Sequence, residues 1–277
     1  MNAEKMQRTV TRFQTDVANS LTQLRADVDA EELHHLPKNH PVTIATELYQ
    51  HVEQVHYEMP FIKKLRHPGI RSRHWKLIEA LIGFDLRSVL DLAVVDVVSM
   101  DFDGKKYQIE EILSKAMSEY ALEFGLDKMR DQLDALQFII ESHDDHNLIA
   151  DQVCCEKIVE IIDAQYVEAQ SLMLSPFVGA FTSRATDWIT YIKDLNSFTE
   201  LLMDCQWSFL YYLPLFSMGD VANLIPEQAQ SFRHITKLYQ TVAKALQVDS
   251  YLVHVPQRPE LRAQLLQCQG LFDGLKG

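Results

Sequence analysis

The segment 65–75, LRHPGIRSRHW, is the densest gathering of residues whose side chains could do chemistry in this chain. It holds three arginines, two histidines and one tryptophan around a single Pro-Gly pair. Such a segment could be a catalytic loop, an anion-binding loop or a structural corner. A catalytic loop needs a nucleophile or general base with a partner that orients it, and no such pair is visible here. The choice therefore lies between charge recognition and structure.

The wider segment 59–78 reverses the sign of the chain's charge. The formal net charge of the whole chain is −13, yet this segment carries six cations and no acidic residue. One interpretation is that the cations bind an acidic partner or an anion. The simpler one is that they pair with acidic residues elsewhere on the same chain. The cations are Lys63, Lys64, Arg66, Arg71, Arg73 and Lys76.

The same segment has the pattern of a corner between two helices. Pro68 disfavours helix at His67, and Gly69 suits the third position of a type II turn that ends at Ile70. A helix can restart just beyond, and its periodicity places Trp75 on the buried face as an aromatic anchor. We therefore predict a helix–helix joint over residues 66–75. Its key residues are Arg66, Pro68, Gly69, Arg71, Arg73, His74 and Trp75.

A second polar cluster, His143-Asp144-Asp145-His146, raises the possibility of a metal site. Two imidazoles and two carboxylates are suitable ligands, and Cys154 and Cys155 follow nearby, but the spacings H-E-x-x-H and C-x-x-C are absent. A solvated polar turn explains the cluster better, so no metal or cofactor is expected. A histidine–carboxylate metalloenzyme remains as a minor alternative. The four cysteines are expected to be reduced, mostly buried thiols.

Motifs for nucleotide and acyl-transfer chemistry are missing from the sequence. It has no G-x-x-x-x-G-K-[ST], no G-x-G-x-x-G and no G-x-S-x-G. A pI of about 5.2 disfavours nucleic acid and anionic membranes as partners. No apolar run approaches the roughly 18–20 residues that span a bilayer, and the N-terminus lacks the apolar core of a signal peptide. We expect a soluble intracellular protein that is not an enzyme by itself.

Helical periodicity dominates the chain and sets the elements that must position these residues. In the first segment, apolar residues recur at steps of three and four from Val10 through Phe13 to Val28, which predicts an amphipathic helix. Two short apolar runs around the DDHN turn predict a β-hairpin near 136–153. We predict helices over about 4–32, 43–57, 75–82, 109–120, 152–174, 226–246 and 259–277.

The longest predicted helix follows Ser175-Pro176, with the serine as N-cap and the proline at the first helical position. Its apolar residues step from Phe181 to Tyr212, and Pro214 is expected to end it. About 38 residues of helix would reach roughly 57 Å, which suits an elongated structure. The last apolar pattern runs to the terminus without a stop, so we expect a chain cut from a longer one. The predicted fold is mainly α, an elongated multi-helix rod with one small hairpin, divided into subdomains 1–135 and 136–277.

Three segments resemble signatures of the linker region of dynein heavy chains, in the same order, and the resemblance extends from about Thr43 to the end of the chain. In the first, L-R-N-P-x-L-R-x-R-H-W, His67 stands where the family usually has asparagine. The matching residues are Leu65, Arg66, Pro68, Ile70, Arg71, Arg73, His74 and Trp75. The second, S-x-F-V-G-P-F…W, is matched by Ser175, Phe177, Val178, Gly179, Phe181 and Trp188.

The third segment resembles Q-R-x-W-M-Y-L-E-P-I-F-S…D-I…L-P-E-E…F. It departs from that pattern at Phe209, where the family usually has tryptophan, and at Leu213, where it has an acid. The matching residues are Gln206, Tyr211, Pro214, Phe216, Ser217, Asp220, Leu224, Pro226, Glu227 and Phe232. We expect Phe177, Trp188, Phe209 and Pro214 to act as packing anchors.

The resemblance implies a mechanical lever. In this family the linker lies across a ring of six AAA+ modules, and it bends and straightens as the ring hydrolyses ATP to drive movement along microtubules. The implied partners are the AAA+ ring of the same heavy chain, the intermediate and light chains of the dynein complex and, indirectly, microtubules. The implied location is the cytoplasm and cytoskeleton, with the form of the first motif favouring the axoneme of a cilium or flagellum. The alternative is a non-motor helical scaffold that binds an acidic partner through residues 59–78.

Overall fold

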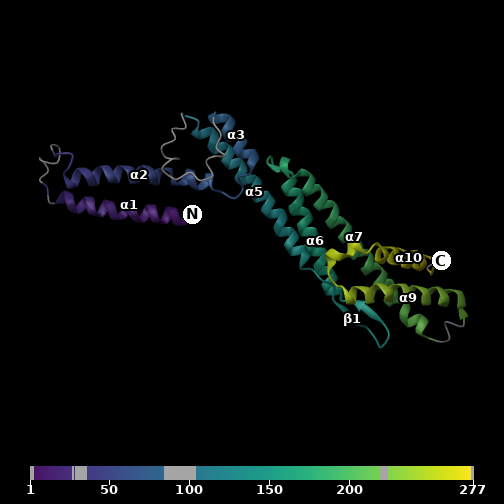
Figure 1. The fold of residues 1–277 in the computed structure, drawn as a ribbon. Coiled ribbons are helices and arrows are strands. Elements are labelled where there is room, and N and C mark those ends of the chain that lie inside the picture. Colours follow the sequence, from purple (N-terminus) through teal and green to yellow (C-terminus); the bar gives the residue numbers. More distant parts are fainter. Residues whose placement is uncertain (1–2, 27, 29–35, 84–103, 219–223, 276–277) are drawn as a thin grey trace. The chain divides into compact units, whose positions relative to one another are not determined.

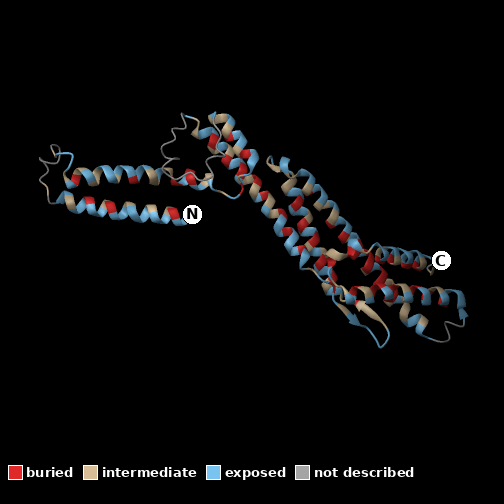
Figure 2. Cartoon of the chain, in the orientation of Figure 1, coloured by how far each residue is buried: buried red, intermediate tan, exposed pale blue. Residues whose placement is uncertain are grey.

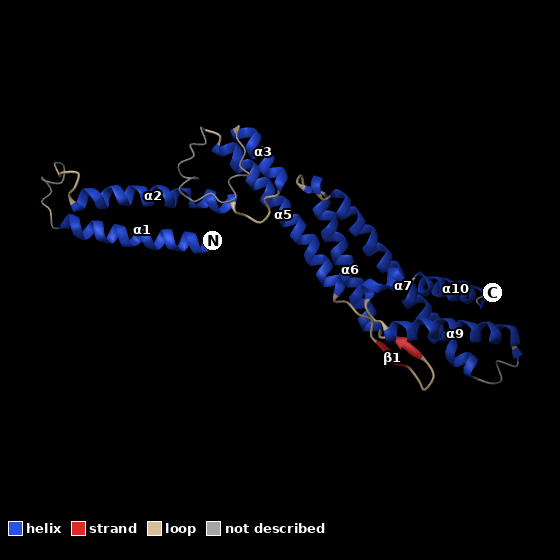
Figure 3. Cartoon of the chain, viewed as in Figure 1, coloured by secondary structure: helices blue, strands red, loops and turns tan. Residues whose placement is uncertain are grey.

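A computed structural model describes residues 3–26, 28, 36–83, 104–218 and 224–275 of the chain (Figure 1). The described part is mainly helical with one two-stranded antiparallel hairpin, as the sequence predicts (Figure 3). Its contacts divide the chain into unit 1, residues 1–121, and unit 2, residues 122–277, with the division inside one long helix. A functional division at 135/136 stays a prediction. No helix among the described residues is long and apolar enough to cross a membrane.

Unit 1 begins with two helices that pack side by side, α1 (Ala3–Ala26) and α2 (Pro41–Leu65). The predicted end of the first helix, near residue 32, lies outside the described residues. Of its predicted apolar seam, Val17 is buried, whereas Phe13 is exposed. Fewer residues of the predicted apolar stripe are therefore buried than the pattern of apolar residues suggested.

The prediction that the second helix ends near residue 57 is wrong, because α2 continues to Leu65. Pro60 lies inside it and is exposed, whereas Met59 and Phe61 on either side are buried. A proline removes one backbone hydrogen bond from a helix. Burial of its two neighbours and of Ile62 offsets that loss, so the helix runs through the proline into the joint.

The rest of unit 1 positions the joint. Helix α3 (Ser72–Ile82) follows it, and α5 (Lys106–Asp134) begins in unit 1 and contains the predicted helix over 109–120. A small apolar cluster joins the three helices, with Phe61 from α2, Ile78 from α3 and Ile109 and Leu113 from α5 fully or almost fully buried. This cluster fixes the ends of α2 and α3 against one face of α5.

Unit 2 is a helical bundle around a larger core. Buried residues, coloured red on the ribbon in Figure 2, recur along α6 and α7. The predictions for the sixth and seventh helical segments, 226–246 and 259–277, agree with α9 and α10. The elements beyond α5 are β1 (Ile140–Ser142), β2 (Leu148–Ala150), α6 (Gln152–Met173), η3 (Val178–Ala180), α7 (Thr182–Ser217), α9 (Pro226–Val248), η4 (Leu252–Gln257) and α10 (Pro259–Leu275).

Two predictions about the ends of α7 are wrong. Ser175 and Pro176 do not start it, because the Ser175 hydroxyl accepts the backbone N–H of Phe177 at 3.3 Å and forms a turn that leads into η3. The helix starts at Thr182 instead. Pro214 does not end it either: this proline is exposed and the helix continues to Ser217. The helix still has 36 residues, close to the predicted length.

The hairpin confirms the prediction near 136–153 and shows what holds it. Ile140 pairs with Ala150, and the outer edge of β2 is occupied by side chains instead of a third strand. The Gln206 amide of α7 bonds both the N–H and the C=O of Ala150, at 2.7 and 2.8 Å. Gln240 of α9 does the same at Leu148, at 2.8 and 3.0 Å. Two glutamine amides thus satisfy an edge that would otherwise be unpaired.

Candidate functional site

The joint contains a tight turn, but not of the predicted type. The N–H of Ile70 donates to the His67 carbonyl at 3.0 Å, and His67 Nδ1 accepts the N–H of Gly69 at 3.1 Å. A type II turn needs positive φ at its third position. Among the described residues, the glycines with positive φ are Gly83 and Gly104, so the type II assignment of the turn is wrong.

Gly69 is needed for close approach and not for backbone conformation. A Cβ added there would lie 2.4 Å from Cβ of Tyr120 and 3.0 Å from the Ala116 carbonyl oxygen, both on α5. The His67 and Tyr120 rings form a T-shaped pair, with centroids 5.1 Å apart and planes at 88°. The turn therefore lies directly on the backbone of α5, at a distance that a side chain would prevent.

His74 closes the start of α3 and connects it to α5. Its ring is almost fully buried, and its Nδ1 accepts the backbone N–H of Arg71 at 3.0 Å. A backbone N–H can only donate, so Nδ1 carries no proton and the ring's proton is on Nε2. That nitrogen donates to Oε2 of Glu119 at 3.1 Å. One imidazole thus satisfies a helix N-terminus on one side and a carboxylate of another helix on the other.

Glu119 is the centre of this network, with a side chain only 6% exposed. Arg73 donates to it from Nε at 3.0 Å and also from its terminal nitrogen. Burial raises the pKa of Glu119, but the hydrogen bonds and charge of Arg73, with the hydrogen bond from His74, outweigh burial and leave the pKa below its usual value. The buried carboxylate is therefore ionised and compensated, which makes it a structural cross-link between α3 and α5.

The other predicted joint residues lie around this network in different ways. Arg66 is the C-cap of α2 and, like Pro68, is exposed. Trp75 is partly buried and packs against the apolar cluster, on the face that the sequence predicted, while the neighbouring His74 is the residue that is almost fully buried. The following residue on a helix points about 100° away, and this turns Trp75 towards the edge of the cluster.

The cations of segment 59–78 divide into two groups. Lys64 forms a salt bridge to Glu110 at 3.2 Å, and Arg73 pairs with Glu119, so these two bind acids of the same chain. Arg71 is the N-cap residue of α3, and the remaining three cations, Lys63, Arg66 and Lys76, are exposed. The interpretation of internal pairing thus accounts for Lys64 and Arg73, while the three exposed cations leave charge recognition open.

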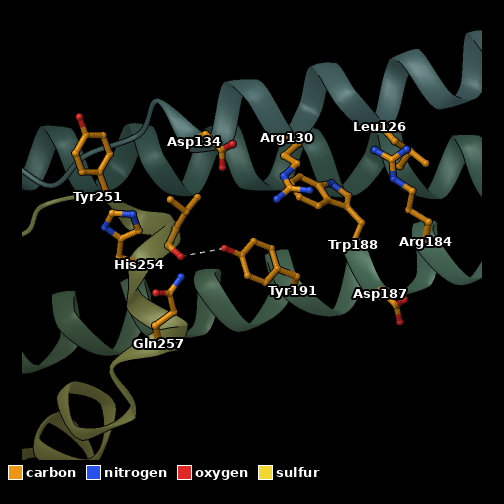
Figure 4. A pocket seen from close by; sticks show the side chains of 11 residues that line it. Leu126, Arg130, Asp134, Arg184, Asp187, Trp188, Tyr191, Tyr251, His254 and Gln257 are labelled. Atoms are coloured by element: carbon orange, nitrogen blue, oxygen red, sulfur yellow. Dashed lines mark hydrogen bonds between the residues drawn. The ribbon is translucent and has the colours of Figure 1, made fainter.

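Unit 2 contains a cleft of about 720 Å³ between α5, α7 and η4 (Figure 4). Trp188 and Tyr191 form its α7 wall, Arg130 approaches from α5, and the Tyr191 hydroxyl donates to the Val253 carbonyl at 3.2 Å. Burial raises the pKa of Tyr191, so its phenol stays neutral. The aromatic walls and neutral phenol provide contact surface, and His254, which also lines the cleft, is paired through Nδ1 with the carboxylate of Asp249 at 2.9 Å.

The remaining predicted anchors of unit 2 have different environments. Phe209 is fully buried and stacks on Tyr239, with ring centroids 5.0 Å apart. Trp188 and Phe177 are partly buried, and Trp188 packs against two apolar clusters. Pro214 is exposed and so does not pack as an anchor.

The second polar cluster, residues 143–146, and the cysteines have environments typical of structural residues. The Asp144 carboxylate accepts the N–H groups of His146 and Asn147, each at 2.8 Å, which closes the hairpin turn. Within the described ranges, no three His, Cys, Asp or Glu side chains are grouped to hold a metal ion. All four cysteines are free thiols, and burial raises the pKa of Cys155 and of Cys205 to about 12. Those two thiols are therefore protonated at neutral pH and poor nucleophiles.

Sequence reasoning missed the residues that complete these sites. Glu119 and Tyr120 lie more than 40 positions from the joint in sequence, and nothing in the local pattern around them indicates that they face it. Gln206 matched the family pattern, but only the fold shows that its amide binds the hairpin. For the joint, the only signal in the sequence was a general one. A run of cations on an acidic chain is expected to pair with acidic residues elsewhere on that chain.

Comparison with known proteins places these features in a family. The family described as dynein heavy chain, N-terminal region 2, matches residues 1–276. The chain is 24% identical over 230 residues to dynein axonemal heavy chain 1 of Mus musculus. It is 24% identical over 237 residues to dynein axonemal heavy chain 6 of Homo sapiens, and 20% identical over 238 residues to human dynein axonemal heavy chain 3.

The matches cover most of this chain and little of its relatives. They span 83% of the chain and 5% of the mouse protein, and 85% of the chain and 6% of each of the two human proteins. The comparison therefore concerns one N-terminal region of very long chains.

Proposed function

Because this chain belongs to the family of dynein heavy chain N-terminal region 2, we propose that it is the mechanical linker of such a chain. In this proposal it bends and straightens over an AAA+ ring of the same heavy chain and converts ATP hydrolysis by that ring into movement along microtubules. ATPase activity belongs to the ring and not to these residues. The observation that carries the proposal is the family match over residues 1–276, which includes both the joint and the bundle.

The construction of the two units supports a role in transmitting force. A lever needs elements that keep their shape when loaded, and long helices cross-linked by buried groups provide this. In unit 1 the Glu119 carboxylate ties α3 to α5. In unit 2 the 36-residue α7 forms the spine of the core.

The relatives also suggest where the lever works. The similar chains are named as axonemal heavy chains. We place this one in the axoneme of a cilium or flagellum, within a dynein complex whose intermediate and light chains are partners. Microtubules are an indirect partner, through parts of the heavy chain beyond this region.

Single-molecule energy transfer on the complete heavy chain tests the proposal. Dyes are attached through non-natural amino acids at exposed positions, one replacing Glu53 on α2 of unit 1 and one replacing Asp163 on α6 of unit 2. The lever predicts that transfer efficiency changes between the ATP-bound and nucleotide-free states. A control pair within unit 2, at Asp163 and Lys237, should stay constant. A constant signal from both pairs through the cycle would rule out bending between the units.

The three exposed cations support a second candidate function, that of a scaffold that binds an acidic partner. Lys63, Arg66 and Lys76 are exposed in a segment without acids. If this function is right, replacing all three by glutamine abolishes co-purification of an acidic partner and leaves thermal stability unchanged. If the lever is right, the same variant supports motility normally.

A further inference from the structure

One face of the second half of α7 is exposed and apolar, although α7 is the spine of the core. Trp207 and Tyr211 are 57% and 68% exposed, and Leu215, one turn further on, continues the same face at helical spacing. Single exposed apolar residues are common, but three in register on one helix mark a surface that binds another chain. The opposite face of the same turns carries the buried Cys205 and Phe209.

A small cleft lies beside this face and adds carboxylate groups to it. Its volume is about 300 Å³, and it lies between α7 and α10 with Trp207 as one wall. Asp204 from α7 and Asp273 from α10 line it, together with the side chain of Gln269. Both aspartates are exposed at the rim. An aromatic ring next to two carboxylates that come from different helices is an arrangement that recognises a cation.

We propose that this cleft and the α7 face bind a partner helix that inserts an arginine beside Trp207. A planar guanidinium can stack on an indole ring and donate to carboxylates at the same time, which an ammonium group does less well. Apolar residues of the partner helix one turn on would cover Tyr211 and Leu215. The charge of the cleft favours a basic partner, as does the net charge of −13 of the chain. This site is independent of the motor function proposed above.

The neighbouring acids strengthen this choice of ligand. Going towards the N-terminus from Trp207, the same face of α7 carries Asp204 and Glu200, both exposed. The face is therefore acidic at one end and apolar at the other. A partner helix that matches it is amphipathic along its length, with an arginine at one end of a leucine-rich stripe.

Trp207 provides a specific reporter for the test. The chain has three tryptophans, and each gives one indole N–H signal in a nitrogen–proton correlation spectrum; Trp207→Phe identifies the signal of Trp207. The probe is a short helical peptide of alanine and leucine with one arginine on the leucine face. The matched probe replaces that arginine by citrulline, which has the same shape and no charge.

The proposal predicts that the arginine peptide shifts the Trp207 signal in a saturable way and leaves the Trp75 and Trp188 signals in place. The citrulline peptide should bind about tenfold more weakly. Asp204→Asn should weaken the arginine peptide by a similar factor, whereas Asp163→Asn, which removes the same charge from exposed α6, should have no effect. Equal binding of both peptides, equal effects of the two Asp variants, or no shift at millimolar peptide would overturn the proposal.

Discussion

The joint in unit 1 and the bundle in unit 2 both bury polar groups, but the surroundings differ. At the joint the buried group is the Glu119 carboxylate, and the apolar cluster nearby is small. In the bundle the buried polar groups are neutral; they include the amide of Gln206 and the hydroxyl of Tyr239, which donates to it at 2.6 Å, within a far larger core. Where little apolar area is buried, single polar and steric details decide stability. Where much is buried, no single polar contact does.

This difference predicts that the two units lose structure separately when perturbed. The largest effect is expected for Phe209→Ala in the bundle, because Phe209 is fully buried and stacks on two other rings. We expect a loss of about 3–5 kcal/mol in the free energy of unfolding of unit 2. Native-state hydrogen exchange should show faster exchange in α7 and α9 and unchanged protection in α3.

Should that variant not fold, Phe209→Leu gives a milder test, with a loss of about 1–2 kcal/mol and the same distribution of exchange. Faster exchange in α3 to the same degree would mean that the two units unfold as one.

His74→Ala tests the opposite case, in which unit 1 is perturbed and unit 2 is left intact. The substitution opens a cavity, leaves the Arg71 N–H without its acceptor and removes one donor from the buried Glu119. We expect a loss of roughly 2–4 kcal/mol in the stability of unit 1. Chemical denaturation, followed by hydrogen exchange in α3, measures it.

His74→Gln is the matched control, because a glutamine at the third helical position can still accept the N–H that precedes the helix. It should recover part of the loss. If the alanine and glutamine variants are equally unstable, the cap at Arg71 contributes nothing.

Gly69→Ala tests steric closeness alone. The new Cβ would have to move away from Tyr120, so we expect a loss of about 1–3 kcal/mol in unit 1, read from thermal unfolding. Gly270→Ala, in α10 of unit 2, meets no atom within 4 Å and should instead stabilise by about 0.4–1 kcal/mol. Effects of opposite sign from these two Gly→Ala substitutions would confirm that contact with α5, and not helix propensity, makes Gly69 necessary. A neutral Gly69→Ala would show that the turn has room to move.

The smallest effect concerns pH. Because the folded pKa of Glu119 lies below its unfolded value, its ionised form contributes stability above the ordinary glutamate pKa of about 4.3. That contribution is lost as pH falls through the lower, folded pKa. The stability difference between the wild type and Glu119→Gln, from urea denaturation at a series of pH values, should therefore be constant near neutrality and shrink below about pH 4. A difference that grows as pH falls would contradict the assigned network.

Much of the fold could be predicted from the sequence, because helical periodicity is a local signal. The residues at which helices end were harder to predict from the sequence. Pro60 and Pro214 were expected to lie outside or at the end of helices, but both are exposed positions inside a helix. Met59 and Phe61 beside Pro60 are buried, and Leu213 and Phe216 near Pro214 are partly buried against the core. The hairpin was predictable from its two apolar runs, whereas the glutamines that hold β2 were not, since they lie about 56 and 92 positions away from their partners in sequence.

The joint shows the same limit in finer detail. Pro68 and Gly69 correctly indicated a turn, and the periodicity correctly indicated a helix after it. The periodicity placed Trp75 on the buried face, and the structure packs it against the cluster with its side chain only partly buried. The more deeply buried residue is His74 beside it, because Glu119 supplies a buried partner for the imidazole. A partner that is distant in sequence decides which of two neighbouring side chains points inward.

We propose that the joint transmits force and takes no part in catalysis. The coupling between ATP hydrolysis and movement tests this proposal most directly. The complete heavy chain with His74→Ala is compared with the wild type and with the surface control Asp163→Asn in a microtubule gliding assay, with ATP turnover measured in parallel. We predict that turnover stays at the wild-type rate while gliding slows several-fold, so that less movement is obtained per ATP. Gliding at the wild-type speed with a demonstrably weakened joint, or turnover that falls in proportion to speed, would contradict the claim.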